Sequence, residues 1–152
     1  MPDTIQIRPA RLSEIIDLRH RILRAGLPRE TAIFSGDELP TSRHFGAFIV
    51  RAGSEEAVGC ATFHLNTWEN QPAWQLRGMA TSEEIRGKGV GRGLLQWAER
   101  ELLAVADAPR VWWCNARVPA IGFYELNGWK VVSEPFDIPT AGPHVRMARR
   151  FA

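Results

Sequence analysis

Apolar residues recur along the chain with two different periods, and the changes between them predict a mixed fold. Apolar and polar positions alternate over residues 4–8, which is typical of a strand with one buried face. From about 12 to 24 the apolar residues return every three or four positions, which predicts a helix with one buried side. The same helical period returns over 91–106 and, more briefly, over 119–126. Further strands are predicted at 45–51, 57–65, 74–81, 110–115, 129–133 and 145–150.

The order of these elements predicts one α/β (α+β) domain, spanning residues 1–152, in which helices cover the faces of a mixed sheet. A turn at 52–56 joins two of the strands into a hairpin. Two segments, 25–44 and 66–72, lack any period and are expected to be loops. A loop as long as 25–44 is unusual in a compact domain and often covers a binding site.

Charge and cysteine content narrow the class of protein. The 19 basic and 17 acidic side chains give a formal net charge of +2, which does not suggest a protein dedicated to nucleic acid. No apolar run approaches the roughly 20 residues that cross a bilayer, so no membrane segment is expected. Cys60 and Cys114 stand in apolar runs and are typical of reduced core thiols in a cytoplasmic protein. We expect no bound metal.

The most distinctive stretch is the glycine loop, residues 86–93, which lies between a predicted strand and a predicted helix. It contains four glycines and three cations within eight positions. Glycine tolerates positive φ and has no Cβ, so such a loop can turn several backbone N–H groups toward one point. The helix that follows adds unpaired N–H groups and the positive end of its dipole. The loop therefore predicts a phosphate-binding site.

Two familiar nucleotide motifs do not fit this loop. A Walker loop requires a serine or threonine after Gly-Lys, but Gly89 follows Gly87-Lys88. A dinucleotide fingerprint requires a third glycine at a position that Arg92 or Leu94 occupies, depending on where the match starts. The loop also follows a hairpin, whereas a dinucleotide fingerprint belongs to an opening βαβ unit.

Residues 86–91, Arg-Gly-Lys-Gly-Val-Gly, instead resemble the [Q/R]-x-x-G-x-[G/A] motif of the GNAT superfamily of N-acetyltransferases. A second block, Ala-Ile-Gly-Phe-Tyr-Glu-Leu-Asn-Gly-Trp at 120–129, is similar to the family's A-x-x-F-Y-E-x-x-G-F segment. The tail at 142–147, Gly-Pro-His-Val-Arg-Met, resembles a G-x-P-H-x-x-M ending of small bacterial members, shortened by one position.

The resemblance implies a largely antiparallel mixed sheet in which two parallel strands splay apart to form a cleft for acetyl-coenzyme A. The pantetheine arm would pair with the backbone of Met79, Ala80 and Thr81. In many members an Asn lies seven residues before the family's tyrosine, but Arg117 stands there in this chain. Asn115 or Arg117 is expected to take over its contact. The implied pyrophosphate cradle comprises Arg86, Gly87, Lys88, Gly89, Val90 and Gly91, extended by Arg92 and Gly93.

The implied reaction is transfer of an acetyl group to a primary amine by direct attack in a ternary complex. Tyr124 occupies the family's general-acid position, where a phenol with an ordinary pKa of about 10 arrives protonated and can donate to the leaving thiolate. It is also expected to contact the coenzyme. The base remains open: His64 and Glu38 are the main candidates, and His144 is expected to bind the substrate. Further base candidates are His44, Glu69 and His144 itself.

Two other functions fit the same residues. The chain could be an inactive regulatory or interaction domain that binds coenzyme A, or it could acetylate a peptide or protein amine. Asp37, Glu38 and Glu69 suggest an acidic lining that would favour a cationic amine. A homodimer is also compatible, because members of the family often dimerise. The acceptor is expected to be selected by 25–44, 66–73 and the tail at His144.

Overall fold

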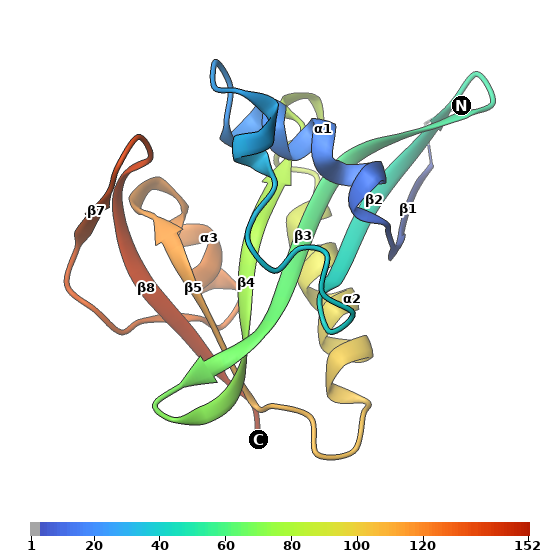
Figure 1. The fold of residues 1–152 in the computed structure, drawn as a ribbon. Coiled ribbons are helices and arrows are strands. Elements are labelled where there is room, and N and C mark those ends of the chain that lie inside the picture. Colours follow the sequence, from blue (N-terminus) through green and yellow to red (C-terminus); the bar gives the residue numbers. More distant parts are fainter. Residues whose placement is uncertain (1–3) are drawn as a thin grey trace.

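The computed structural model describes residues 4–152, whose strands form a single mixed sheet (Figure 1). Its strand order is β1-β2-β3-β4-β5-β8-β6, with β7 paired to β8. All neighbouring strands are antiparallel except β4 and β5. The strands are β1 Ile5–Pro9, β2 Arg43–Arg51, β3 Ser54–Trp68, β4 Gln71–Thr81, β5 Val111–Arg117, β6 Lys130–Val131, β7 Phe136–Ile138 and β8 Gly142–Arg150.

Two long helices lie on opposite faces of this sheet (Figure 1). Helix α1 (Leu12–Leu23) packs Ile15 and Leu18 against Cys60 and Ala80 on one face. Helix α2 (Val90–Leu103) buries its apolar stripe in the larger core on the other face. The remaining helical segments are α3 Ile121–Leu126 and the short 3-10 turns η1 Arg29–Ala32, η2 Glu83–Ile85 and η3 Val118–Ala120. No helix within the described residues is long and apolar enough to cross a membrane.

The parallel pair β4–β5 stays together only at one end. Their register consists of Trp74 with Trp112, Gln75 with Trp113, and Leu76 with Cys114. Beyond these pairs the two strands diverge, as the upper part of Figure 1 shows, so residues 77–81 and 115–117 face each other without a ladder. The predicted fold class, a largely antiparallel mixed sheet with a splayed parallel pair, is therefore confirmed.

A β-bulge lies in β4 just where the splay begins. Arg77 pairs with Thr62 and Ala80 with Cys60, so Gly78 and Met79 together oppose a single residue of β3. Gly78 has a φ of +63°, which a residue with a side chain rarely adopts. A Cβ at Gly78 would also come within 2.6 Å of Arg19 Nε. The bulge bends β4 and leaves the extra residue out of the ladder.

Two predicted loops are partly strands in the structure. The segment expected as a loop at 66–72 continues the β3–β4 hairpin, and Glu69 and Asn70 form its tight turn with φ of +51° and +63°. Positive φ at both central residues is the geometry of a type I′ turn, but no glycine marks it in the sequence. Strand β7 lies between the strands predicted at 129–133 and 145–150, where no element was expected. Its three residues are too few to show a period, and Pro135 and Pro139 flank it.

Candidate active site

The glycine loop precedes α2 in a conformation that requires glycine. Gly87 and Gly89 have φ of +79° and +82°. A Cβ at either position would meet nothing within 4 Å, so the backbone conformation, and not crowding, is what requires glycine there. Gly89 is also the N-cap of α2, which turns the first N–H groups of the helix toward the loop.

Several N–H groups of this loop remain free to bind an anion. Lys88 N donates to Ile85 O at 3.3 Å and Gly93 N to Gly89 O at 2.9 Å. Within the described residues no acceptor is found for the N–H groups of Gly87, Gly89, Val90, Gly91 and Arg92. The side chains of Arg86, Lys88 and Arg92 are exposed, and none forms an ion pair with a described carboxylate. Unpaired N–H donors, exposed cations and a helix N-terminus are together the features that bind an anion in other proteins.

A cavity of about 630 Å³, here called the loop cavity, extends from this loop along the end of β4 to α3. Lys88 does not line it, and Gly93 faces β1, where a Cβ would lie 2.8 Å from Ile7 Cδ1. The predicted coenzyme residues that line it are Met79, Ala80, Thr81, Arg86, Gly87, Gly89, Val90, Gly91, Arg92 and Tyr124.

A second cavity of about 290 Å³, here called the arginine cavity, lies between the end of α1 and the diverging parts of β4 and β5. Arg24, Arg77 and Arg117 line it, together with Asn115 and His144. The two cavities share three lining residues, Met79, Ala120 and Tyr124. Both cavities therefore border the side chain of Tyr124 and adjoin each other at these three residues.

Tyr124 is held in α3 with its hydroxyl 3.8 Å from Met79 Sδ. Its ring packs against Phe123 and Trp129, with ring centres 5.2 and 5.4 Å away. The side chain is buried, and burial raises the pKa of the phenol well above its ordinary value, with nearby Cys114 adding to the effect. The phenol is therefore protonated throughout the neutral range and can donate a proton.

The base candidates named from the sequence are dispersed. His64 is buried, with Nε2 2.9 Å from Asp37 Oδ1, and lines neither cavity. Glu38 is exposed on the loop before β2 and also lines neither cavity. Glu69 lies in the β3–β4 turn, with Oε2 3.4 Å from Arg150. Of the base candidates, only His144 lines the arginine cavity.

His144 presents one free ring nitrogen. Its Nδ1 lies 2.8 Å from the carbonyl oxygen of Gly142, which can only accept, so Nδ1 carries the proton in the neutral ring. Nε2 is then an acceptor with no partner among the described residues. The ring is buried and stacks on Phe136 with 6.2 Å between centres.

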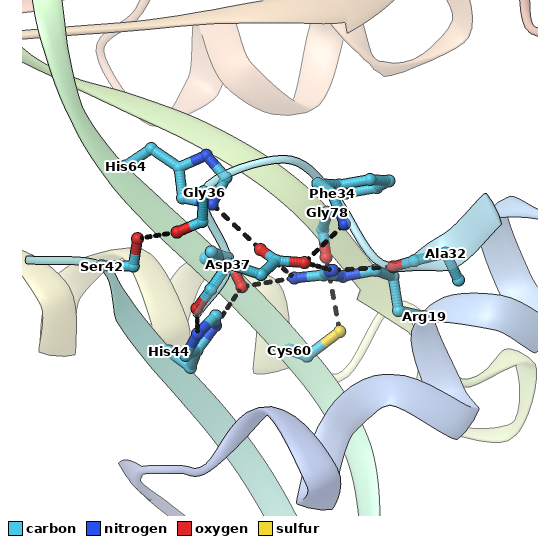
Figure 2. Close-up of polar contacts among 11 residues, drawn as sticks. Arg19, Ala32, Phe34, Gly36, Asp37, Ser42, His44, Cys60, His64 and Gly78 are labelled. Carbon is cyan, nitrogen blue, oxygen red and sulfur yellow. Dashed lines mark hydrogen bonds and ion pairs between the residues drawn. The ribbon is translucent and has the colours of Figure 1, made fainter. Parts of the chain in front are cut away.

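A buried ion pair that the sequence did not reveal fixes the loop before β2, as Figure 2 shows. Arg19 on α1 and Asp37 both have fully buried side chains, and Arg19 Nη1 lies 2.6 Å from Asp37 Oδ2. Asp37 also accepts hydrogen bonds from Phe34 N and His64. Burial alone would raise the pKa of Asp37, but these hydrogen bonds outweigh it and hold the pKa well below its usual range. Arg19 follows Ile15 by four positions and so lies on the apolar stripe of α1. This position was the sign in the sequence that its side chain is buried.

A relay of hydrogen bonds completes this cluster (Figure 2). Thr62 Oγ1 accepts from Arg19 Nη2 at 2.7 Å and lies 2.8 Å from His44 Nδ1. His44 Nε2 lies 2.9 Å from the carbonyl oxygen of Asp37. Burial lowers the pKa of His44, so the ring stays neutral and donates through Nε2. Asp37 was expected in an acidic lining, and His44 and His64 were expected as base candidates. In the structure both histidines instead bond to Asp37.

The two cysteines occupy the core, as expected. Cys60 and Cys114 are buried, and burial raises the pKa of each thiol to about 12. A thiol that stays protonated at neutral pH is a poor nucleophile, so neither is suited to carry an acetyl group.

The comparison with known proteins agrees with this geometry. The profile of the acetyltransferase (GNAT) family matches residues 12–129, which include the glycine loop and α3. The chain belongs to the GNAT family. The uncharacterized N-acetyltransferase YitI of Bacillus subtilis is 33% identical over 149 residues, with 94% of each chain covered. The chain is accordingly an acyl-CoA-dependent N-acetyltransferase of the GNAT family.

Solved structures of other proteins share the GNAT fold of this chain. Escherichia coli ElaA superposes with a TM-score of 0.76 at 20% identity, covering 97% of this chain and all of ElaA. An aminoglycoside 6'-N-acetyltransferase complexed with coenzyme A superposes with a TM-score of 0.72 at 15% identity, covering 95% and 96%. At these identities the likeness concerns the fold.

Proposed function

We propose that this N-acetyltransferase moves an acetyl group from acetyl-CoA to the primary amine of a small molecule by direct attack in a ternary complex. The observation that supports this most is the meeting of the two cavities at Met79, Ala120 and Tyr124. One cavity extends to the glycine loop, and the other is lined by arginines of α1, β4 and β5. Two substrates could therefore be held in adjoining cavities with the same phenol between them.

The loop cavity suits coenzyme A at both of its ends. The free N–H groups and cations of the glycine loop would bind the pyrophosphate. The backbone of 77–81, which lacks a strand partner toward β5, offers free donors and acceptors to the two amides of the pantetheine arm. Met79 and Phe123 give this channel an apolar wall.

The bound coenzyme supplies an acetyl thioester, which an amine attacks and from which a thiolate leaves. Tyr124 then acts as the general acid: its phenol, kept protonated by burial, gives its proton to the departing sulfur. The bulge at Gly78 and Met79 leaves backbone groups out of the ladder beside this phenol, where they can orient the acetyl group.

His144 is the base that the geometry favours. Its Nδ1 bonds to the Gly142 carbonyl, which leaves Nε2 of the neutral ring as an acceptor, and the residue lines the arginine cavity. It would accept the proton of the incoming ammonium, directly or through one water. His64 and Glu38, which lie outside both cavities, have no comparable access.

The experiment that tests this function is free-thiol release from acetyl-CoA in the presence of amines of different classes. We expect coenzyme A to be released only when a primary amine is present, with mass spectrometry identifying the N-acetyl product. Initial rates measured over both substrates should give intersecting double-reciprocal lines, as a ternary complex requires. Tight binding of acetyl-CoA without turnover of any amine would instead favour the regulatory alternative.

A further inference from the structure

Three arginines from distant parts of the chain converge on the arginine cavity. Arg24 Nη1 and Arg117 Nη2 donate to the same carbonyl oxygen, that of Leu23, at 3.0 and 3.1 Å. Arg24 and Arg77 both lie over the ring of Phe34, at 5.1 and 4.5 Å from its centre. The end of α1, the diverging part of β4 and the end of β5 thus bring three cations to one pocket.

No negative charge within the described residues balances them. None of the three arginines forms an ion pair, and no aspartate or glutamate lines the cavity. Burial lowers the pKa of Arg77 and the charge of Asp37 acts to raise it, but the carboxylate itself is bonded to Arg19 and His64. The Leu23 carbonyl and the Phe34 ring offer only partial charges.

The cost of this arrangement indicates that the cavity binds an anionic ligand. All three side chains are partly buried. Burial and repulsion by Arg117, Arg77 and Arg19 lower the pKa of Arg24, and burial lowers that of Arg77. Partly buried cations without a partner are unfavourable, and proteins retain them where a ligand supplies the opposite charge. Guanidinium groups are suited to carboxylate and phosphate because they can donate two parallel hydrogen bonds.

We infer that the acceptor is a small amine that also carries an anionic group, a carboxylate or a phosphate, held by Arg24, Arg77 and Arg117. This rests on the acetyl transfer proposed above and names its substrate class. The anion binds at the arginines and the amine extends toward Tyr124 and His144, which line the same cavity. The volume of about 290 Å³ suits a molecule of about amino-acid size. A cationic amine, which the sequence favoured, would be repelled.

The first test compares acceptors that differ only in the anionic group. The common α-amino acids and β-alanine are each assayed against the corresponding carboxamide, and phosphoethanolamine is assayed against ethanolamine; 1,3-diaminopropane represents cationic amines. We expect kcat/KM for at least one anionic acceptor to exceed that of its uncharged counterpart by about tenfold or more, as loss of a charge-assisted hydrogen bond implies. Comparing the effect in the carboxylate pairs with that in the phosphate pair shows which of the two anions the site prefers.

The second test removes one cation at a time. Arg24→Gln, Arg77→Gln and Arg117→Gln should each raise KM for the anionic acceptor by about tenfold or more, with KM for acetyl-CoA unchanged and little effect on the uncharged counterpart. Arg110→Gln, an equal loss of charge at an exposed position before β5, is the matched control and should change neither constant. Thermal unfolding of each variant shows whether it is folded.

A binding measurement separates failure of this inference from failure of the proposed reaction. N-acetylated forms of the preferred acid and of its amide, or of β-alanine and β-alaninamide if no amine is turned over, are titrated calorimetrically into the protein loaded with coenzyme A. Tighter binding of the acid, weakened by Arg117→Gln, supports the inference even without turnover. Equal binding of acid and amide, or turnover that prefers neutral or cationic amines, would overturn it while the acetyltransferase activity stands.

Discussion

Tyr124 is the residue on which the proposed chemistry depends most directly. Tyr124→Phe removes only the hydroxyl from a ring that packs between Phe123 and Trp129, so the fold should be retained. Because the proton it donates is needed when the thiolate leaves, we expect kcat to fall by about 10²-fold or more, with KM for acetyl-CoA within a few-fold. Steady-state kinetics with both substrates measure the two effects.

The pH dependence of the same residue gives an independent check. Burial raises the pKa of Tyr124, so its acid form persists above the ordinary pKa of about 10. The wild-type kcat should therefore show no loss from phenol ionisation up to about pH 10. An unchanged kcat in Tyr124→Phe would remove the general-acid role whatever the pH profile.

Gly89 tests the anion cradle through its backbone conformation. Gly89→Ala places a Cβ on a residue with φ of +82°, where left-handed geometry costs roughly 1–2 kcal/mol, and the loop is expected to relax and misdirect its N–H groups. We predict a several-fold or larger rise in KM for acetyl-CoA. Gly53→Ala, at φ +77° in the β2–β3 turn with equally open surroundings, is the control: it should lower stability similarly and leave KM unchanged. Equal KM values in both variants would contradict a role for this loop in coenzyme binding.

The glycine loop could be predicted at the residue scale because its chemistry is local. A strand, closely spaced glycines with cations and an amphipathic helix stand together between 74 and 106, so neighbouring positions were enough to predict the anion site. The arginine cavity could not be found in this way. Arg24, Arg77 and Arg117 are separated by many residues, and only the fold brings them together. The same is true of Asp37, which was expected in an acidic lining but is turned inward by Arg19.

At the scale of elements, the Arg19–Asp37 pair joins α1, the loop before β2 and strand β3. Asp37→Asn keeps the shape of the side chain but leaves the buried Arg19 without its counter-charge. We expect a loss of about 3–5 kcal/mol in the free energy of unfolding, measured by urea denaturation at pH 7. The exposed pair of Arg29 with Asp17 provides a control of the same chemistry.

Asp17→Asn breaks that exposed pair, whose side chains are 54% and 85% accessible, and should cost no more than about 1 kcal/mol. A loss in Asp37→Asn as small as that in Asp17→Asn would mean that the buried pair does not hold the loop. Because the pKa of Asp37 is held below its usual range, its contribution is present above the unfolded pKa of about 3.9 and is lost only as the pH falls toward the folded value.

The elements themselves were predicted well where a period persists over several residues, as in α1, α2 and the later part of β4, residues 74–81. The end of β3 and the start of β4 were missed because Asn66, Thr67 and Pro72 interrupt the alternation and the Glu69-Asn70 turn carries no glycine. Strand β7 has only three residues, too few for a period to be read. Its pairing to β8 depends on the rest of the sheet, which a local pattern does not contain.

For the whole molecule, the sheet consists of two antiparallel halves joined through three residue pairs of β4 and β5, together with the core around Trp112. The antiparallel half that contains β1–β4 carries α1, while the other half carries the short helix with Tyr124. Coenzyme bound in the loop cavity would contact both halves, at Met79 on β4 and at Tyr124 on α3. Coenzyme binding should therefore affect the diverging ends of β4 and β5 as well as the glycine loop.

We predict that amides of 77–81 and 115–117 that point into the splay exchange rapidly with solvent in the free protein and become protected by coenzyme A, because no strand partner protects them. The amides of 74–76, already in the ladder, should change little. Hydrogen–deuterium exchange with and without coenzyme A measures this, and the β2–β3 turn at 52–53, which lines neither cavity, serves as the internal control. Protection of 86–92 without any change at 77–81 would mean that only the pyrophosphate is held as proposed and that the pantetheine arm follows another path.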